Sequence, residues 1–106
     1  MTIEFETPYG KVSEKLVGYL RKEIMKLAHK RDHVARAEVS LKEDKLFLPP
    51  ENKICSIRLT IFGDNLVAHS RASSFYGAAR EAVADLNRKL KKHTDSLEEV
   101  TSSIDV

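Results

Sequence analysis

The chain has 106 residues, of which 42% are hydrophobic and 32% charged, a balance typical of one globular domain that folds by itself and has no room for a second catalytic domain. The formal net charge is only +2, so the total charge neither indicates nor excludes nucleic acid as a partner. Short apolar runs, an N-terminus without a signal-peptide pattern and a lone cysteine, Cys55, predict a cytoplasmic protein without a membrane span or disulfide.

The first elements are a strand and an amphipathic helix. Residues 2–7 alternate, with Ile3 and Phe5 as the apolar positions, which predicts a half-buried strand. Apolar residues then recur at helical spacing from Ser13, a predicted N-cap, to about residue 30. The other side of this helix carries a stripe of lysines with Tyr19 beside it: Lys11, Lys15, Lys22, Lys26 and Lys30.

Three strands follow. The alternation in residues 34–42 and 55–61 predicts two strands, each with one side facing the core. The inward residues of the first are Ala35, Ala37, Val39 and Leu41. Those of the second are Cys55, Ile57, Leu59 and Ile61. The intervening segment 43–52, with Pro49-Pro50, reads as an exposed connection. Gly63-Asp64-Asn65 is predicted as a hairpin turn that opens a fourth strand at Leu66.

The last helix reads SFYGAAREAVADLNRKLKKHTD from Ser74, with Ser73 as the predicted N-cap. Its apolar stripe consists of Phe75, Ala79, Ala82, Val83, Leu86 and Leu90, and roughly opposite lie Arg80, Asn87, Arg88 and Lys91. The segment from residue 95 to 106 is acidic and has no Lys or Arg, so we expect a flexible tail there and a domain over residues 1–94.

These elements predict an α+β fold of order β-α-β-β-β-α, similar to a double-stranded-RNA-binding domain. The last three strands should form an antiparallel meander, and the first should join the same sheet through the crossover helix. Because every strand alternates, both helices should cover one apolar face in a two-layer sandwich.

The sequence carries little that indicates catalysis. His29 and His33 are four residues apart but are crowded by charge, the glycines form no phosphate-binding loop, and no nucleophile-elbow motif surrounds a serine. Cys55 lies in an apolar strand, as a buried structural thiol does. We therefore expect no enzyme, no cofactor, no metal site and no small-molecule substrate.

The distribution of charge favours an anionic partner. Residues 11–36 contain eight Lys or Arg against three acids, and residues 80–92 contain five against two, while the acidic tail masks this excess in the total. Two such helices side by side would form a basic groove able to hold phosphates. Strand cations could make the open sheet face weakly basic as well: Arg36, Arg58, His69 and Arg71.

Four segments together resemble the ribosome hibernation-promoting and ribosome-associated inhibitor family, also called sigma-54 modulation proteins. They are VSEKLVGYLRKEIMKL (12–27), ARAEVSLKED (35–44), LTIFGDNLVAHS (59–70) and FYGAAREAVADLNRKLKKH (75–93). The resemblance implies a stress-response factor that binds the small ribosomal subunit in the channel of messenger and transfer RNA and blocks translation. It also implies a short form without the second domain that pairs ribosomes.

In this family the contacts to ribosomal RNA come largely from basic residues of the two helices. The residue pattern and the resemblance together give these candidate RNA-binding residues: Lys15, Lys22, Lys26, Lys30, Arg80, Arg88, Lys91, Lys92 and His93. Tyr76 and Ala79 match the family's helix start and are expected in the core. The chain departs from the family at Glu23, Asp85 and Thr94, where relatives have lysine, and at Ser74, where they have aspartate.

We therefore predict a ribosome-binding translation regulator that acts by occlusion. Two alternatives remain open at this point. One is a protein-interaction module, such as a transcription regulator, that uses the open sheet face and the Pro49-Pro50 loop. The other is a generic binder of double-stranded RNA.

Overall fold

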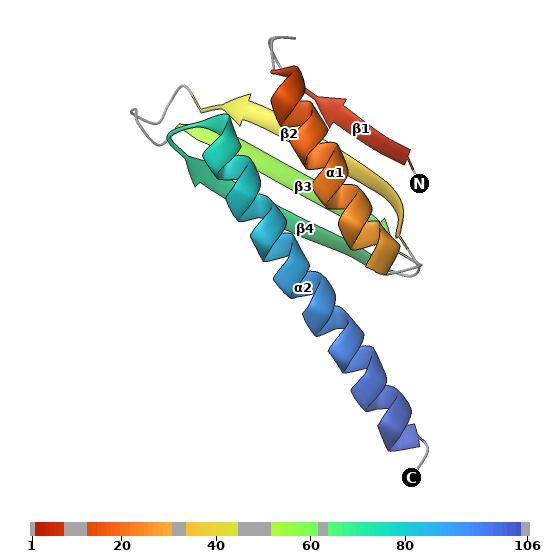
Figure 1. The fold of residues 1–106 in the computed structure, drawn as a ribbon. Coiled ribbons are helices and arrows are strands. Elements are labelled where there is room, and N and C mark those ends of the chain that lie inside the picture. The colour runs from red at the N-terminus through yellow and green to blue at the C-terminus, as the bar shows by residue number, and fades with distance from the viewer. Residues whose placement is uncertain (1, 8–12, 31–33, 45–51, 62–63, 105–106) are drawn as a thin grey trace.

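Six elements follow one another in the predicted order (Figure 1). A computed structural model describes residues 2–7, 13–30, 34–44, 52–61 and 64–104, with side chains for all of these except Lys30 and residues 93–104. The elements are β1 (Thr2–Glu6), α1 (Glu14–Lys30), β2 (Val34–Glu43), β3 (Lys53–Ile61), β4 (Asp64–Ala72) and α2 (Phe75–Ile104).

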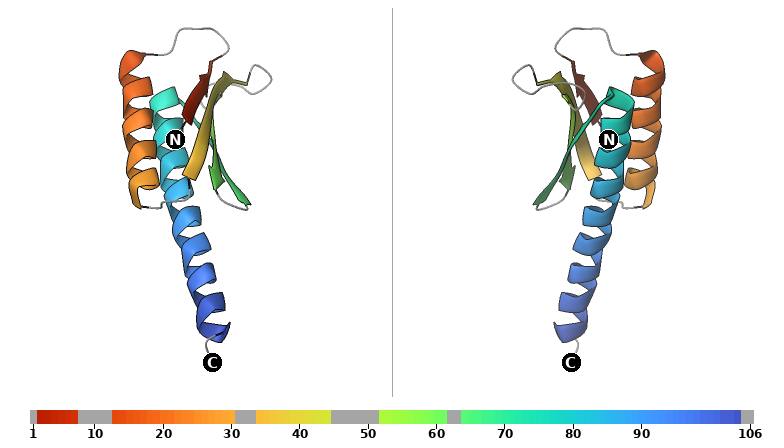
Figure 2. Two further views of the ribbon diagram at one scale, coloured as in Figure 1. Left: turned by 90° about the vertical axis from the view of Figure 1, so that its right-hand side faces the viewer. Right: turned by 90° about the vertical axis from the view of Figure 1, so that its left-hand side faces the viewer.

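The four strands form one mixed sheet in the order β1-β2-β3-β4. β1 pairs in parallel with β2, and β2, β3 and β4 form the predicted antiparallel meander. The register aligns Phe5 with Val39, Val39 with Ile57, and Ile57 with Ala68, so one apolar row crosses the whole sheet. Both helices cover this face and leave the other open (Figure 2), which confirms the two-layer α+β sandwich.

The core lies between the sheet and the helices. α1 contributes Leu16, Leu20, Ile24 and Leu27, and α2 contributes a row of small residues followed by larger ones: Ala78, Ala79, Ala82, Val83, Leu86 and Leu90. The fully buried alanines allow the start of α2 to approach the sheet closely. α2 then runs on past the sheet and past the end of α1 (Figure 1).

The inward position predicted for Ala35 is wrong. Val34 pairs with Ile61 and Arg36 with Thr60, so Ala35 occupies a β-bulge and is exposed. Val34 takes the place at the edge of the core instead. The bulge shifts the alternation by one residue, and from Ala37 onward the predicted inward side is confirmed.

Both helices begin at a serine cap. The Ser13 hydroxyl accepts the Lys15 N–H at 3.2 Å, which confirms that N-cap. In α2 the hydroxyl of Ser74, one residue after the predicted Ser73, accepts the Gly77 N–H at 3.0 Å. Ser74 is the cap because the helix begins at Phe75, whose ring packs against the core.

The turn and the tail also differ from expectation. Asp64 and Asn65 are already paired with Ile61 and Thr60, so β4 begins two residues earlier than predicted, and Gly63 lies outside the described residues. Residues 45–51 of the predicted exposed connection, with Pro49-Pro50, lie outside them too, but the connection is shorter than predicted, because β2 includes Glu43, β3 begins at Lys53 and Asn52 is buried. At the other end α2 continues through Ile104, so the backbone of residues 95–104 is helical. The flexibility of the tail stays a prediction.

Candidate nucleic-acid interface

The outer face of α1 presents the described part of the lysine stripe. Lys15, Lys22 and Lys26 are exposed, because the apolar residues of the same helix hold its other side against the sheet. Lys26 donates to Glu23 at 3.2 Å and still has 57% of its side chain exposed. Lys11 and the side chain of Lys30 lie outside the described residues.

The basic residues of α2 divide between two sides of the helix. Each residue adds about 100° around the axis, so Arg80 and Lys91 lie within about 60° of Tyr76. The Tyr76 ring contacts Tyr19 of α1, which places this side against α1. Arg80 and Lys91 are exposed and so join the lysines of α1 on the helix surface.

Arg88 and Lys92 lie on the other side of α2. They fall within about 20° of Glu81 around the helix. Glu81 accepts a hydrogen bond from Ser70 of β4 at 2.8 Å, so this side faces the sheet edge. Arg88 and Lys92 are exposed, yet they do not lie beside the lysines of α1. The side chain of His93 lies outside the described residues.

Asp85 organises the charges on that second side. It accepts from Arg88 at 3.2 Å and from Lys89 at 3.0 Å, and the bond from Lys89 is the main reason that the pKa of Asp85 is lowered. Lys89 also donates to the backbone oxygen of Val67 at 2.7 Å. Lys89 therefore ties α2 to the edge of β4, while Asp85 offsets part of the positive charge there.

A pair of tyrosines joins the two helices. The rings of Tyr19 and Tyr76 lie 5.1 Å apart between centroids at an interplanar angle of 49°. The Arg80 guanidinium lies 5.9 Å from the centroid of the Tyr76 ring, within the range of a cation–π contact. We call the line along which α1 and α2 meet at these rings the helix seam.

Sequence reasoning placed Tyr76 in the core, and this is wrong because Tyr76 is 51% exposed. Ala79, its companion in that prediction, is fully buried, as expected. The position of Tyr76 around the helix, at the edge of the apolar stripe, could have indicated that its side chain is partly exposed. Its contact was not predictable, because the partner ring belongs to a helix more than fifty residues earlier.

Contacts at the seam raise the pKa of Tyr19. Partial burial is the largest cause, the charge of Glu23 and the Tyr76 ring raise the pKa further, and Arg80 lowers it. The Tyr19 phenol is uncharged at physiological pH, where tyrosine is neutral even without this shift.

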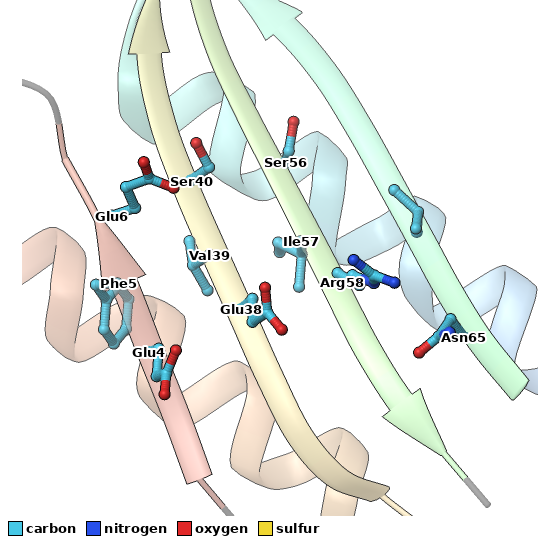
Figure 3. A pocket seen from close by; sticks show the side chains of 11 residues that line it. Glu4, Phe5, Glu6, Glu38, Val39, Ser40, Ser56, Ile57, Arg58 and Asn65 are labelled. Atoms are coloured by element: carbon cyan, nitrogen blue, oxygen red, sulfur yellow. The ribbon is translucent and has the colours of Figure 1, made fainter.

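The open sheet face has a different character. It holds a hollow of about 590 Å³, seen in Figure 3 with the helices behind the sheet. Three carboxylates lie on this face: Glu4, Glu6 and Glu38. Arg36 bonds to Glu4 at 2.6 Å and to Glu38 at 3.3 Å, and Glu4 raises the pKa of the Arg36 guanidinium.

Of the other basic residues on the open face, Arg71 pairs with an acid. It bonds to Asp44 at 3.1 Å, whereas His69 shares a 2.7 Å hydrogen bond with the neutral Ser56. Carboxylates therefore lie among the strand cations, and the face is mixed in charge where the sequence suggested a weakly basic surface.

Cys55 and His29 are the described residues among the cysteine and histidines that the sequence offered for chemistry. Cys55 is fully buried, and desolvation raises its pKa to about 12, so it is a protonated thiol at neutral pH. His29 is exposed, and His33 lies outside the described residues. Within the described ranges, no three His, Cys, Asp or Glu side chains are grouped as they are around a metal ion. No helix in the same ranges has the length and apolarity needed to cross a membrane.

Two solved structures have a similar fold. A ribosomal subunit interface protein from Coxiella burnetii aligns with a TM-score of 0.76 at 16% identity, over 90% of this chain and 99% of that protein. The N-terminal domain of Protein Y from Thermus thermophilus aligns with a TM-score of 0.67 at 17% identity, over 87% of this chain and 94% of that domain. At these identities the likeness concerns the fold.

The sequence itself was compared in two ways. A search of curated proteins gave no significant match. Residues 4–98, in contrast, match the family described as sigma 54 modulation protein / S30EA ribosomal protein, and this match spans all six elements. The chain therefore belongs to the sigma 54 modulation protein / S30EA ribosomal protein family, in agreement with the resemblance stated from its sequence.

Proposed function

We propose that this protein is a ribosome-associated factor that binds RNA of the small ribosomal subunit through the cations along its helix seam. Membership of the family makes the ribosome the expected partner, and one solved relative is itself described as a ribosomal subunit interface protein. The observation that carries the proposal is the exposure of Lys15, Lys22 and Lys26 on α1, together with Arg80 and Lys91 on the adjoining side of α2.

The chemistry of this surface suits RNA. Lysine and arginine contacts to phosphate supply affinity with little sequence information, and folded RNA is largely recognised by its shape. The packed sheet holds both helices in place before binding, so little ordering entropy is lost when they dock. A rigid domain that occupies the path of messenger and transfer RNA would inhibit translation by occlusion, without any catalytic step.

Different parts of the chain are proposed to have different roles. Residues 1–94 carry the binding surface, and residues 95–106 are proposed to act as a flexible acidic tail. Arg88 and Lys92 face the β4 side of α2 and are proposed as contacts to a separate stretch of phosphates. The proposed site of action in the cell is the cytoplasm, where ribosomes are found.

Charge reversal tests this surface. The triple variant Lys22→Glu, Lys26→Glu, Lys91→Glu should lose at least about tenfold in affinity for small subunits at moderate salt, because repulsion replaces three phosphate contacts. The control is Lys42→Glu with Arg58→Glu on the open sheet face, which should bind like wild type; it is compared with the double variant Lys22→Glu, Lys26→Glu, which has the same change of charge and should bind more weakly than wild type. Affinity is measured by co-sedimentation, and folding by circular dichroism.

The control also tests the alternative of a protein-interaction module on the open face. That alternative predicts the opposite ranking, with binding lost in the sheet variant and kept in the helix variant. It further predicts binding that survives high salt, because contacts to buried apolar surface do not depend on released counterions.

A further inference from the structure

The inference concerns Tyr76, an aromatic residue that the fold leaves half uncovered. Large apolar side chains that are exposed in the described part of the chain are Met25, Val67 and Tyr76, and Tyr76 is the aromatic one. Its ring contacts the tilted ring of Tyr19, which is itself packed against the core. The ring is therefore held in one orientation while 51% of the residue remains exposed.

A purely structural brace does not need this exposure. Tyr19 and Tyr76 could join the helices with both rings covered, as buried aromatic pairs do. Instead, exposed cations lie along the tyrosine pair: the Arg80 guanidinium lies 5.9 Å from the centroid of the Tyr76 ring, and Lys15 and Lys22 lie one turn on either side of Tyr19. An uncharged aromatic surface is thus framed by groups that attract phosphate.

We propose that Tyr76, backed by Tyr19, is a stacking platform for one unpaired RNA base, a role that rests on the RNA binding proposed above. The base covers the exposed part of the ring, and the flanking phosphates contact Arg80 and Lys22. Base stacking on an aromatic side chain tolerates any base, since each base has a π face. The cationic frame favours a nucleotide over an apolar protein segment, and the aromatic ring favours a nucleotide over an acidic segment, which has no base to stack.

The negative charge of Glu23 is compatible with a nucleotide at the seam. Its carboxylate is paired with Lys26 at 3.2 Å, so its charge is partly offset. The seam is thereby suited to a nucleotide, which presents an aromatic plane and an anion together.

Substitutions of Tyr76 separate stacking from charge. Tyr76→Leu should weaken binding to small subunits about tenfold, the usual scale of one lost base stack. Tyr76→Phe, which keeps the ring, should bind within about twofold of wild type. The slope of affinity against salt should be the same in all three proteins, because no phosphate contact is removed. Thermal unfolding of each variant measures separately how much stability is lost with the contact between Tyr76 and Tyr19.

A second measurement uses the absence of tryptophan from the chain. Tyr76→Trp introduces a single fluorophore, and Met25→Trp is its matched control, because Met25 is also 51% exposed but lies on α1 away from the ring pair. Single-stranded oligoadenylate should quench Tyr76→Trp at low salt and leave Met25→Trp unchanged. Duplex RNA, whose bases are already stacked, should quench neither.

The proposal is overturned if Tyr76→Leu binds small subunits as wild type does, if Tyr76→Phe loses as much as Tyr76→Leu, or if oligoadenylate quenches both tryptophans equally. The two proposals also fail in different ways. If wild-type protein does not pellet with ribosomes but oligoadenylate quenches Tyr76→Trp, the result contradicts the proposed binding to ribosomes and supports the proposed stacking site. Wild-type pelleting with no effect of Tyr76→Leu contradicts the stacking site alone.

Discussion

At the scale of single residues, Glu23 is the acid that most directly affects the proposed surface. It lies among the lysines of α1, pairs with Lys26 at 3.2 Å, and is close enough to Tyr19 to raise its pKa. One carboxylate in a row of cations lowers the local positive potential and engages one of the lysines that would otherwise face a phosphate.

Replacing this acid should therefore strengthen binding. Glu23→Lys is expected to raise affinity for small subunits about threefold to tenfold and to steepen its salt dependence by about one unit of slope. Glu6→Lys makes the same change of charge on the open sheet face and should leave affinity within about twofold. Equal gains from both variants would mean that net charge, and not this surface, governs binding.

Ser74 allows a residue-scale test of the fold. Ser74→Ala removes the hydroxyl that accepts the Gly77 N–H, and should cost about 1 kcal/mol of unfolding free energy. For a domain of this size, the loss corresponds to a fall in Tm of about 5 °C. The neighbouring Ser73→Ala should change Tm by less than about 2 °C, because Ser73 is exposed and precedes the cap. Equal falls in the two variants would contradict the cap assignment.

At the scale of elements, Asp85 and Lys89 hold α2 along the edge of β4. The pKa of Asp85 is lowered, chiefly by the bond from Lys89, so the folded state favours the carboxylate. A lowered pKa gives stability that is complete above the ordinary Asp value of 3.8 and is lost as pH falls through the folded value.

Acid unfolding checks this contact. Asp85→Asn should lower Tm between pH 5 and pH 7, and the difference from wild type should shrink as the pH falls below about 4 and through the lowered pKa of Asp85, because the protonated carboxyl is then as uncharged as the amide. Thermal scans from about pH 2.5 to pH 7 measure it. A difference that stays constant, or grows, below about pH 4 would show that the Asp85 charge does not stabilise α2.

The elements also show what the sequence could and could not predict. Alternation and helical spacing predicted the two layers because each element buries one face, as Ala37 in β2 and Leu86 in α2 do. The bulge at Ala35 depends on the register with β3, which local alternation does not contain. The choice between Ser73 and Ser74 depends on where Phe75 meets the core.

The candidate site was predictable only in part. The lysine stripe of α1 follows from helical spacing alone, and Lys15, Lys22 and Lys26 are exposed as expected. The division of the α2 cations was not predictable, because it depends on which side of α2 meets α1 and which meets β4. Tyr76 and Glu81 mark those two sides by contacts between elements distant in sequence.

At the scale of the whole molecule, the two layers carry different charge. The helix layer presents cations and a tyrosine pair, while the open sheet face offsets its arginines with carboxylates. The described part of the molecule measures 54 × 26 × 18 Å, and its long dimension follows α2 beyond the sheet (Figure 1). RNA docking on the helix layer would thus meet a largely cationic surface over the sheet, whereas residues 95–104 of α2, beyond the sheet, contain acids and no Lys or Arg.

Co-sedimentation of the wild-type protein with purified small and large ribosomal subunits, over a series of salt concentrations, tests the central claim most directly. The account predicts that the protein pellets with the small subunit at about one copy per subunit. The affinity should fall as salt rises, because binding releases counterions from the RNA phosphates. Pelleting with neither subunit at low salt, or small-subunit binding that is insensitive to salt, would contradict it.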